Sequence, residues 1–531
     1  MRDSLKDFYK EVLSKRFYSL SLMIITAISY LFSMTNRTVS IDGISGRYYN
    51  NPQMVSSWIA GKRWGFVLIN WLFSTDVEIP FVNHFIGTLF FVLASIMLSF
   101  LLFSITNQKE AIIYTIVSGS FLSFPLINEI YEYEDCDVYV SLNFCLIILA
   151  VLVHLYYRGK TLNKLFIETI VLVPVAAGYE SVAFAYVTLV LAVICIRLIS
   201  DSEIKPSSQF VDGLIQAIPL VLSIIVKFLV GIILIYILNT PNSTAGASQI
   251  MWGVCNPWDI MRTNIYLYFA RGILYLPIFA FALFGVLACG SIVFCTKKTK
   301  KWGLTFWVMA LISVFGQSII QCSAMPYRTA QTVHIFTSVN IFIFLMLVSE
   351  NAPHRVSYII FALCMFLVFR QSISLCRLLT LNNQRSTNEA ILASQIGYRV
   401  LTEFDNDKPV VFVGQYWEGS WIDRAMTVRE PSKLLKLDNK FRMFLGLPEV
   451  DCERVVDTNV RSYLSWGARA EVAPDLEVLK WYFSYWGYDI NVVSGITPDE
   501  KNNYETKAKE LGMTKYQILD ADDCILVCLG W

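Results

Sequence analysis

Residues 215–238 read IQAIPLVLSIIVKFLVGIILIYIL, an apolar run in which Lys227 is the one charged residue. A helix needs about 20 predominantly apolar residues to cover the roughly 30 Å hydrocarbon core of a bilayer. This run therefore predicts a transmembrane helix. Its pattern recurs along the chain as far as about residue 372, where the composition changes.

Working outward from this run, we predict eleven membrane spans in residues 1–372. The basic N-terminus precedes an apolar run too long for the apolar core of a signal peptide, so we interpret that run as a retained first span. The predicted spans are 18–35, 83–105, 111–127, 138–157, 165–179, 182–199, 215–238, 272–295, 304–320, 334–349 and 355–371.

The composition agrees with a polytopic membrane protein. Of 531 residues, 55% are hydrophobic and 16% are charged, and the mean hydropathy is +0.52, whereas a soluble domain carries about 25% charged residues. The net charge of +1 and the lack of a basic tract give no sign of a nucleic-acid partner. Twelve cysteines are present without a CxxC pair or a Cys/His cluster, so neither a zinc site nor a disulfide framework is indicated.

The positive charges of the short loops predict the orientation, because cytoplasmic loops are enriched in Lys and Arg. With eleven spans, the basic segments fall on one side, which we assign to the cytoplasm together with the N-terminus. The segments predicted to face outward are 36–82, 128–137, 180–181, 239–271, 321–333 and everything after about 372. The chain is thus expected in the cytoplasmic membrane.

Residues 373–531 predict a small extracytoplasmic α/β domain. Residues 383–404 read as an amphipathic helix with one apolar stripe, which comprises Ile391, Leu392, Ile396, Val400, Leu401 and Phe404. Segments 408–414 and 524–529 read as buried strands, and residues 500–511 as a helix. Neither strand precedes a glycine-rich phosphate loop, so a nucleotide site is not supported. Cys524 and Cys528 are interpreted as buried thiols.

The same domain is rich in aromatic residues, which either fill its core or present flat apolar faces to sugar rings. The second alternative would let the domain guide a polymeric acceptor. The residues concerned are Tyr416, Trp417, Trp421, Trp466, Trp481, Tyr482, Tyr485, Trp486 and Tyr488.

Carboxylates gather in the segments predicted to face outward. Asp42 follows the first span, in a polar and aromatic loop, and is the main candidate for a catalytic group. The loop 128–137 contributes Glu129, Asp135 and Asp137 as candidates to orient an acceptor or to hold a divalent cation such as Mg²⁺ or Mn²⁺. Glu180 lies where two spans meet with no room for a loop. An ionisable group at that depth is costly, which makes Glu180 a further candidate to orient the acceptor or hold a cation.

Three cations complete the set of candidates. Arg328 opens the outer end of the tenth predicted span, Lys227 lies in the middle of the seventh, and Arg63 belongs to the Gly-Lys-Arg-Trp run 61–64. A lipid-linked phosphate leaving group needs a cation that stabilises its developing charge, and Arg matches phosphate oxygens with two donors. Alternatively, Arg328 anchors at the headgroups, and Lys227 extends to the membrane surface or pairs with Glu180.

With these residues in view, residues 15–372 resemble the polytopic glucosyl transferases of the serotype-conversion type, within the GT-C class of membrane glycosyltransferases. The resemblance rests on short motifs: the acid in Ser40-Ile41-Asp42-Gly43, the run 61–64, the segment 125–137, the Tyr179-Glu180 step and Arg328. Three departures occur. The family often has a second acid where this chain has Gly43, and Tyr-Gln where it has Tyr179-Glu180; its loop acid is shifted by about one position here, so Asp135 and Asp137 are both candidates.

The resemblance implies a polyprenyl-phosphate-linked sugar, glucose, as donor and a surface polysaccharide such as O-antigen or teichoic acid as acceptor. On this interpretation the enzyme inverts the anomeric carbon, with Asp42 as general base. The alternative is a transporter or flippase of a lipid-linked sugar or a small solute, and a third hypothesis is a surface scaffold. Transporters often carry paired internal repeats, and no such halves are visible in the sequence.

Overall fold

The computed structural model divides the chain into two compact units. The first, here called the membrane unit, comprises Met1–Thr35, Val55–Arg377 and Ser432–Asp451; the second, the C-terminal unit, comprises Asn36–Met54, Leu378–Pro431 and Cys452–Trp531. The residues that the structure describes are 1–36, 38–39, 51–73, 80–106, 108–131, 136–201, 203–240, 250–265, 276–295, 301–323, 329–405, 407–414, 427–429, 440, 443–444, 446, 454–456, 477–493 and 496–531.

The membrane unit is helical throughout its described residues. Most elements are α-helices, with one short π-helical turn and one 3₁₀ turn. In chain order they are α1 (Arg2–Phe8), η1 (Tyr9–Leu13), α2 (Arg16–Thr35), α4 (Asn51–Ala60), α5 (Trp64–Phe73), α6 (Pro80–Ile105), α7 (Ala111–Leu122), η2 (Pro125–Ile127), α8 (Asn128–Tyr131), α9 (Asp137–Tyr156), α10 (Thr161–Ala176), α11 (Glu180–Ser200), α12 (Pro206–Ile237), α14 (Pro257–Ile265), α15 (Leu276–Cys295), α16 (Lys301–Val314), α17 (Gly316–Gln321), α18 (Gln331–Asn351) and α19 (His354–Glu403). The first four residues of α4 and the part of α19 after Arg377 belong to the C-terminal unit.

Seven of these helices are long and apolar enough to cross a membrane within the described part of the chain: α2, α6, α9, α11, α12, α18 and α19. The other four predicted spans fall on α7, α10, α15 and α16, which are not among these seven. A multi-pass membrane bundle is therefore present, whereas the predicted number of eleven spans is not confirmed.

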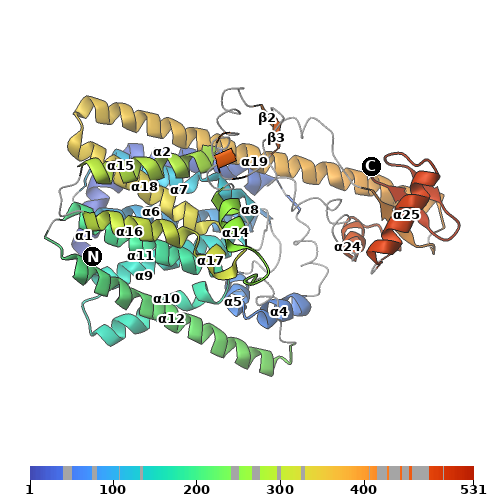
Figure 1. The fold of residues 1–531 in the computed structure, drawn as a ribbon, viewed down its shortest axis with the longest axis horizontal. Helices are drawn as coiled ribbons and strands as arrows, with labels where there is room; N and C mark the ends of the chain where they lie inside the picture. Colours follow the sequence, from blue (N-terminus) through green and yellow to red (C-terminus); the bar gives the residue numbers. More distant parts are fainter. Residues whose placement is uncertain are drawn as a thin grey trace. The chain divides into compact units, whose positions relative to one another are not determined.

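The bundle is built from closely packed pairs of helices (Figure 1). α6 packs against α9, α11 against α16, α15 against α18, and α10 against α12. α18 is buried along most of its length, whereas α12 exposes much of its apolar surface. A helix that is apolar all round is suited to the interior of such a bundle or to contact with lipid.

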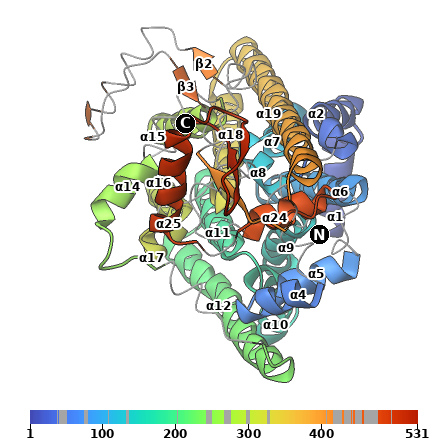
Figure 2. The same cartoon turned by 90° about the vertical axis from the view of Figure 1, so that its right-hand side faces the viewer.

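The short helices α5, α8, α14 and α17 gather at one end of the bundle, on the right in Figure 1 and facing the viewer in Figure 2. α5 lies within residues 36–82, which are predicted from the sequence as one outward-facing segment between two spans. This stretch contains an apolar helix that packs against α9 and α10. This end of the bundle carries the candidate site described below.

The C-terminal unit contains the predicted strands and helix. β1 (Val410–Val413) pairs in parallel with β5 (Ile525–Cys528), and β4 (Ile518–Asp520) pairs antiparallel with β5. β2 (Thr427–Arg429) and β3 (Arg454–Val456) form a separate antiparallel pair. α24 (Glu477–Tyr485) and α25 (Pro498–Glu510) complete the unit, and a capping box between Thr497 and Glu500 begins α25.

The predicted helix 383–404 is the last part of α19, continuous with the helix of the eleventh predicted span. Ile396 and Val400 of its predicted stripe are buried in the core of the C-terminal unit. Ile391 is 53% exposed, so its place on that stripe is wrong; Ala393, on the side facing the strands, is buried instead.

Those of the predicted acceptor-guiding aromatic residues that the structure describes belong to the core of this unit. Trp481 and Tyr482 are buried, and Tyr485, Trp486 and Tyr488 pack against the same cluster. The core-filling alternative therefore holds for these five. Tyr416, Trp417, Trp421 and Trp466 lie outside the described residues.

Candidate functional site

Glu180, Lys227 and Arg63 form an ion cluster at the end of the bundle that carries the short helices. Lys227 Nζ donates to Glu180 Oε1 at 2.7 Å, and Arg63 Nη2 lies 3.4 Å from Glu180 Oε2. The three side chains come from α12, the first turn of α11 and the turn between α4 and α5. The pairing of Lys227 with Glu180, one of the two alternatives predicted for Lys227, is thus present.

The three groups differ in exposure. The Lys227 side chain is 7% exposed, that of Arg63 31% and that of Glu180 42%. The Arg63 guanidinium also lies 5.5 Å from the centroid of the Trp58 ring and 5.8 Å from that of Tyr179, distances at which aromatic faces attract a cation. Two formal positive charges share one carboxylate, so the cluster carries one excess positive charge on a partly open surface.

The end of α10 fixes the turn that leads to Glu180. The last carbonyls of a helix have no partner within it. Here a side chain and a main-chain N–H group from other elements supply the donors. The Tyr139 hydroxyl donates to the Pro174 carbonyl at 2.7 Å, and the Gly65 N–H donates to the Ala177 carbonyl at 2.8 Å. A Cβ at Gly178 would lie 1.7 Å from the Tyr139 oxygen, so this turn requires glycine.

The run 61–65 is held on α12 as well as on α10. The Trp64 indole N–H donates to the carbonyl of Lys227 at 3.1 Å. Gly231, one turn after Lys227, allows Lys62 to approach, because a Cβ there would lie 3.0 Å from Lys62 Cγ. These contacts bring Arg63 and Lys227 to the same carboxylate although they are far apart in the sequence.

Asp137 lies in a different environment from the one predicted. Its side chain is fully buried at the start of α9, where Oδ2 lies 2.7 Å from His84 Nδ1 and Oδ1 accepts from the Val138 N–H at 2.6 Å. The His84 ring stacks on Tyr131, whose hydroxyl lies 3.1 Å from Thr88 Oγ1. Both carboxylate oxygens are thus engaged inside the bundle, an arrangement that does not suit a metal ligand or an acceptor contact.

The remaining candidates cannot be placed. Asp42, Asp135 and Arg328 lie outside the described residues, and Glu129 lies in α8 with its side chain outside them. In the part of the chain that the structure describes, no group of three or more His, Cys, Asp or Glu side chains has the arrangement of a metal site.

Sequence reasoning missed two buried polar groups. One is His84, the partner of Asp137. The other lies where α9, α10 and α12 meet, with His154 Nδ1 3.1 Å from Glu168 Oε1 and His154 Nε2 2.9 Å from Asp212 Oδ1. The signal was available, because an ionisable residue inside a predicted span needs a partner, and these residues occur within or beside apolar runs.

Comparison with known proteins gives one family. Residues 31–369 match the model of the glucosyl transferase GtrII family, a stretch that includes all three residues of the ion cluster. Comparison with the curated proteins yields no match.

Among solved structures, the chain is similar to the archaeal oligosaccharyltransferase AglB from Archaeoglobus fulgidus, determined in complex with an inhibitory peptide and a dolichol-phosphate. The TM-score is 0.38 and the sequence identity 11%; the similarity covers 79% of this chain and 64% of that one, less than two thirds of the relative's length.

Proposed function

The chain belongs to the glucosyl transferase GtrII family, and from this premise we propose that it transfers glucose from a polyprenyl-phosphate carrier to a cell-surface polysaccharide on the outer side of the cytoplasmic membrane. It is a membrane glycosyltransferase, with several helices long and apolar enough to span a bilayer. Membership of a transferase family favours transfer over the transporter, flippase and scaffold hypotheses.

The observation that carries the proposal is the ion cluster of Arg63, Lys227 and Glu180. Its excess positive charge suits an anionic group that approaches from the exposed side. Arg63 has further guanidinium donors beyond the one directed at Glu180, and a guanidinium fork matches phosphate oxygens. We assign donor-phosphate binding to Arg63 and Lys227, with Arg328 as a third proposed cation.

The proposed reaction inverts the anomeric carbon. An oxygen of an acceptor hydroxyl attacks C1 of glucose, and its proton passes to the Asp42 carboxylate acting as general base. The bond between C1 and the phosphate oxygen breaks, and the electron pair leaves with polyprenyl phosphate. Cations already in place at the phosphate stabilise the charge that develops on this leaving group.

Glu180 holds the two cations in this scheme. Its carboxylate accepts from both, so it fixes their positions before the donor arrives, and preorganised charge needs no rearrangement during the reaction. Because Asp137 does not fit a metal ligand or an acceptor contact, these roles stay proposals for Asp135 and Glu129 alone. Mg²⁺ or Mn²⁺ bound there would supply an additional positive charge.

A transfer assay tests this function. Purified protein is incubated with radiolabelled polyprenyl-phosphate-glucose and extracted wall glycan, and label in the polymer is counted for the wild type, Asp42→Asn and the exposed control Asp259→Asn. The proposal expects transfer by the wild type and the control, and a loss of about 100-fold or more in Asp42→Asn, the scale of general-base catalysis. Near-normal transfer by Asp42→Asn would remove Asp42 as the base.

A further inference from the structure

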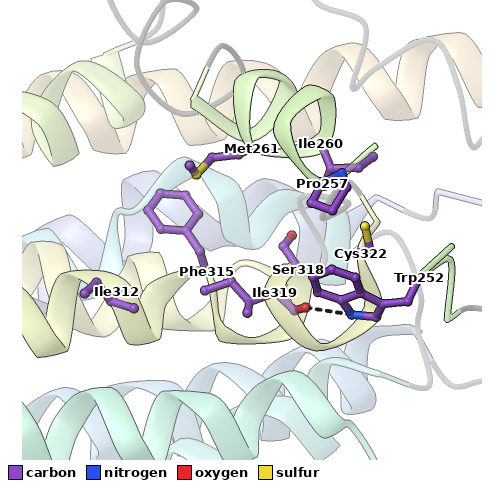
Figure 3. Close-up of a pocket in the computed structure, with 9 residues that line it drawn as sticks. All are labelled: Trp252, Pro257, Ile260, Met261, Ile312, Phe315, Ser318, Ile319 and Cys322. Carbon is purple, nitrogen blue, oxygen red and sulfur yellow. Dashed lines mark hydrogen bonds between the residues drawn. The ribbon is translucent and has the colours of Figure 1, made fainter. Parts of the chain in front are cut away.

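An apolar pocket lies between α14 and α17 in the membrane unit (Figure 3), with a cavity volume of about 330 Å³. This is within the range of about 300–1,000 Å³ that small-molecule sites occupy. Its lining is apolar except for one hydroxyl group. The lining residues are Trp252, Pro257, Ile260, Met261, Ile312, Phe315, Ser318, Ile319 and Cys322.

Two contacts fix the walls of this pocket. The Trp252 indole N–H donates to the carbonyls of Ile319 and Ile320 at 3.1 and 3.0 Å, which ties the segment before α14 to α17. Trp252 and Ile319 are nonetheless about half exposed, as is Met261 on the opposite wall. The pocket is therefore partly open to its surroundings, and the hydrogen bonds of Trp252 fix one of its walls.

Ser318 is the polar exception. Its side chain is 3% exposed and points into the space between α14 and α17 (Figure 3), and its hydroxyl has no hydrogen-bond partner among the described residues. An unpaired buried hydroxyl costs free energy. The hydroxyl itself has almost no accessible surface, so a ligand contacts the apolar atoms around it.

α17, which forms one wall of the pocket, packs against α11, the helix that carries Glu180. A Cβ at Gly316, the first residue of α17, would lie 2.6 Å from Phe184 Cδ1, one turn after Glu180 in α11. Phe315, immediately before Gly316, lines the pocket. α17 thus contacts α11 one turn away from Glu180, the carboxylate of the ion cluster.

We propose that this pocket binds part of the isoprenoid chain of the lipid-linked donor, with the phosphate directed to the Arg63–Lys227 cluster. The assignment rests on the proposed function for the identity of the donor. The apolar lining excludes a sugar or a phosphate from the pocket itself, because burying such groups without partners is costly. A lipid chain that ends in a phosphate places its apolar part in the pocket and its charge at the Arg63–Lys227 cluster.

The walls of the pocket favour an isoprenoid over a saturated acyl chain. Each isoprene unit carries a polarisable carbon–carbon double bond, which a saturated chain lacks. Aromatic and sulfur-containing walls, contributed by Trp252, Phe315 and Met261, suit polarisable unsaturated groups.

The test measures binding rather than turnover. Ser318→Phe fills the pocket from α17, and Met261→Trp fills it from α14, where the residue is already 45% exposed and tolerates bulk. Val308→Phe adds bulk at an exposed position of α16 that does not line the pocket. Affinity is measured for a long-chain polyprenyl phosphate and for geranyl phosphate, with phosphatidylglycerol as competitor. Melting temperatures identify variants that fold.

We expect both filling variants to weaken long-chain binding about tenfold, the effect of losing burial for a few methyl or methylene groups. Geranyl phosphate should bind all variants alike, because its charged end is held by the cluster, and Val308→Phe should match the wild type. Unchanged long-chain affinity in whichever filling variant folds would overturn the pocket, as would phosphatidylglycerol competing as well as the polyprenyl phosphate.

This result is separable from the proposed function. If the protein binds the long chain through the pocket but transfers no glucose, the pocket proposal is supported and the transferase proposal is contradicted. If the protein transfers glucose while the filling variants bind the long chain normally, the transferase proposal is supported and the pocket proposal is contradicted.

Discussion

Lys227 and Glu180 form an ion pair at 2.7 Å in which the lysine is almost fully buried and the carboxylate is 42% exposed. The other carboxylate oxygen, Oε2, lies 3.4 Å from Arg63 Nη2. One acid therefore positions two cations, one inside the bundle and one near its surface. This relationship is the basis of the phosphate site proposed for the donor.

The first prediction concerns the stability of this pair. Lys227→Met removes a charge-assisted hydrogen bond, and we expect the free energy of unfolding to fall by about 2 kcal/mol. Glu180 keeps Arg63 as a partner and is partly solvated, so the loss should not be larger. Melting temperatures in detergent measure it. The double variant Lys227→Met/Glu180→Gln should lose less than the sum of the single variants; strict additivity would mean that the pair contributes nothing.

The second prediction assigns Asp137 to structure. His84→Ala leaves a buried carboxylate without its partner, which typically costs about 3–5 kcal/mol, so the yield and melting temperature of the protein should drop. Asp137→Asn keeps a hydrogen-bonding group at the same place and should fold. Transfer per folded molecule should then stay near the wild-type rate. An Asp137→Asn protein with a normal melting temperature but no turnover would show instead that Asp137 acts in the site.

The third prediction concerns Ser386 of the C-terminal unit and its effect on the proposed general base, Asp42. The Ser386 hydroxyl accepts from the Val39 N–H at 3.1 Å and donates to the Val39 carbonyl at 3.4 Å. Val39 precedes Asp42 by three positions in the sequence, and residues Asn36–Met54 belong to the C-terminal unit. We therefore expect Ser386→Val to lower kcat about tenfold with little change in the donor KM, the effect of misplacing a catalytic group.

Ser394→Val is the matched control for this prediction, because the Ser394 hydroxyl donates only to Ala390 within its own helix among the contacts described. Ser386→Thr keeps a hydroxyl and should restore most of the rate. Equal rates for Ser386→Val and Ser394→Val would contradict a role for Ser386 in positioning the segment.

The fourth prediction concerns the thiols of the C-terminal unit. Cys524 and Cys528 are buried beside and within β5, and burial raises the pKa of the Cys524 thiol to about 11. At about pH 8, a little below the ordinary cysteine pKa, that thiol stays protonated in the folded protein and ionises partly when unfolded. Mass spectrometry should find both residues unalkylated by iodoacetamide until denaturant is added. Rapid labelling of the native protein would contradict this.

Periodicity and composition predicted much of the fold. Apolar runs located the long helices, and short runs rich in valine and isoleucine located β1 and β5. The number of spans was harder to predict. The apolar runs 111–127 and 304–320 are long enough for spans, but the helices they contain, α7 and α16, are shorter. α5 was missed since it lies within a segment whose polar and aromatic composition resembles a loop.

For the site, the sequence identified the groups but not their partners. Glu180 and Lys227 were found because an ionisable group is costly at membrane depth. Their contact depends on how α11 and α12 pack, which a single sequence does not specify. Asp137 was expected in an exposed acidic loop, yet it begins α9 and faces His84, because the helix starts earlier than the hydropathy pattern indicated.

The central claim is that Arg63 and Lys227 hold the phosphate of the lipid-linked donor. The most direct measurement is the affinity of the purified protein for polyprenyl phosphate in the wild type, Arg63→Ala, Arg63→Lys and Lys227→Met. The account predicts that Arg63→Ala and Lys227→Met each weaken binding by roughly ten- to 100-fold, the value of one charge-assisted contact, and that Arg63→Lys recovers only part of the loss because it lacks the fork. Wild-type affinity in folded Arg63→Ala and Lys227→Met proteins would contradict it.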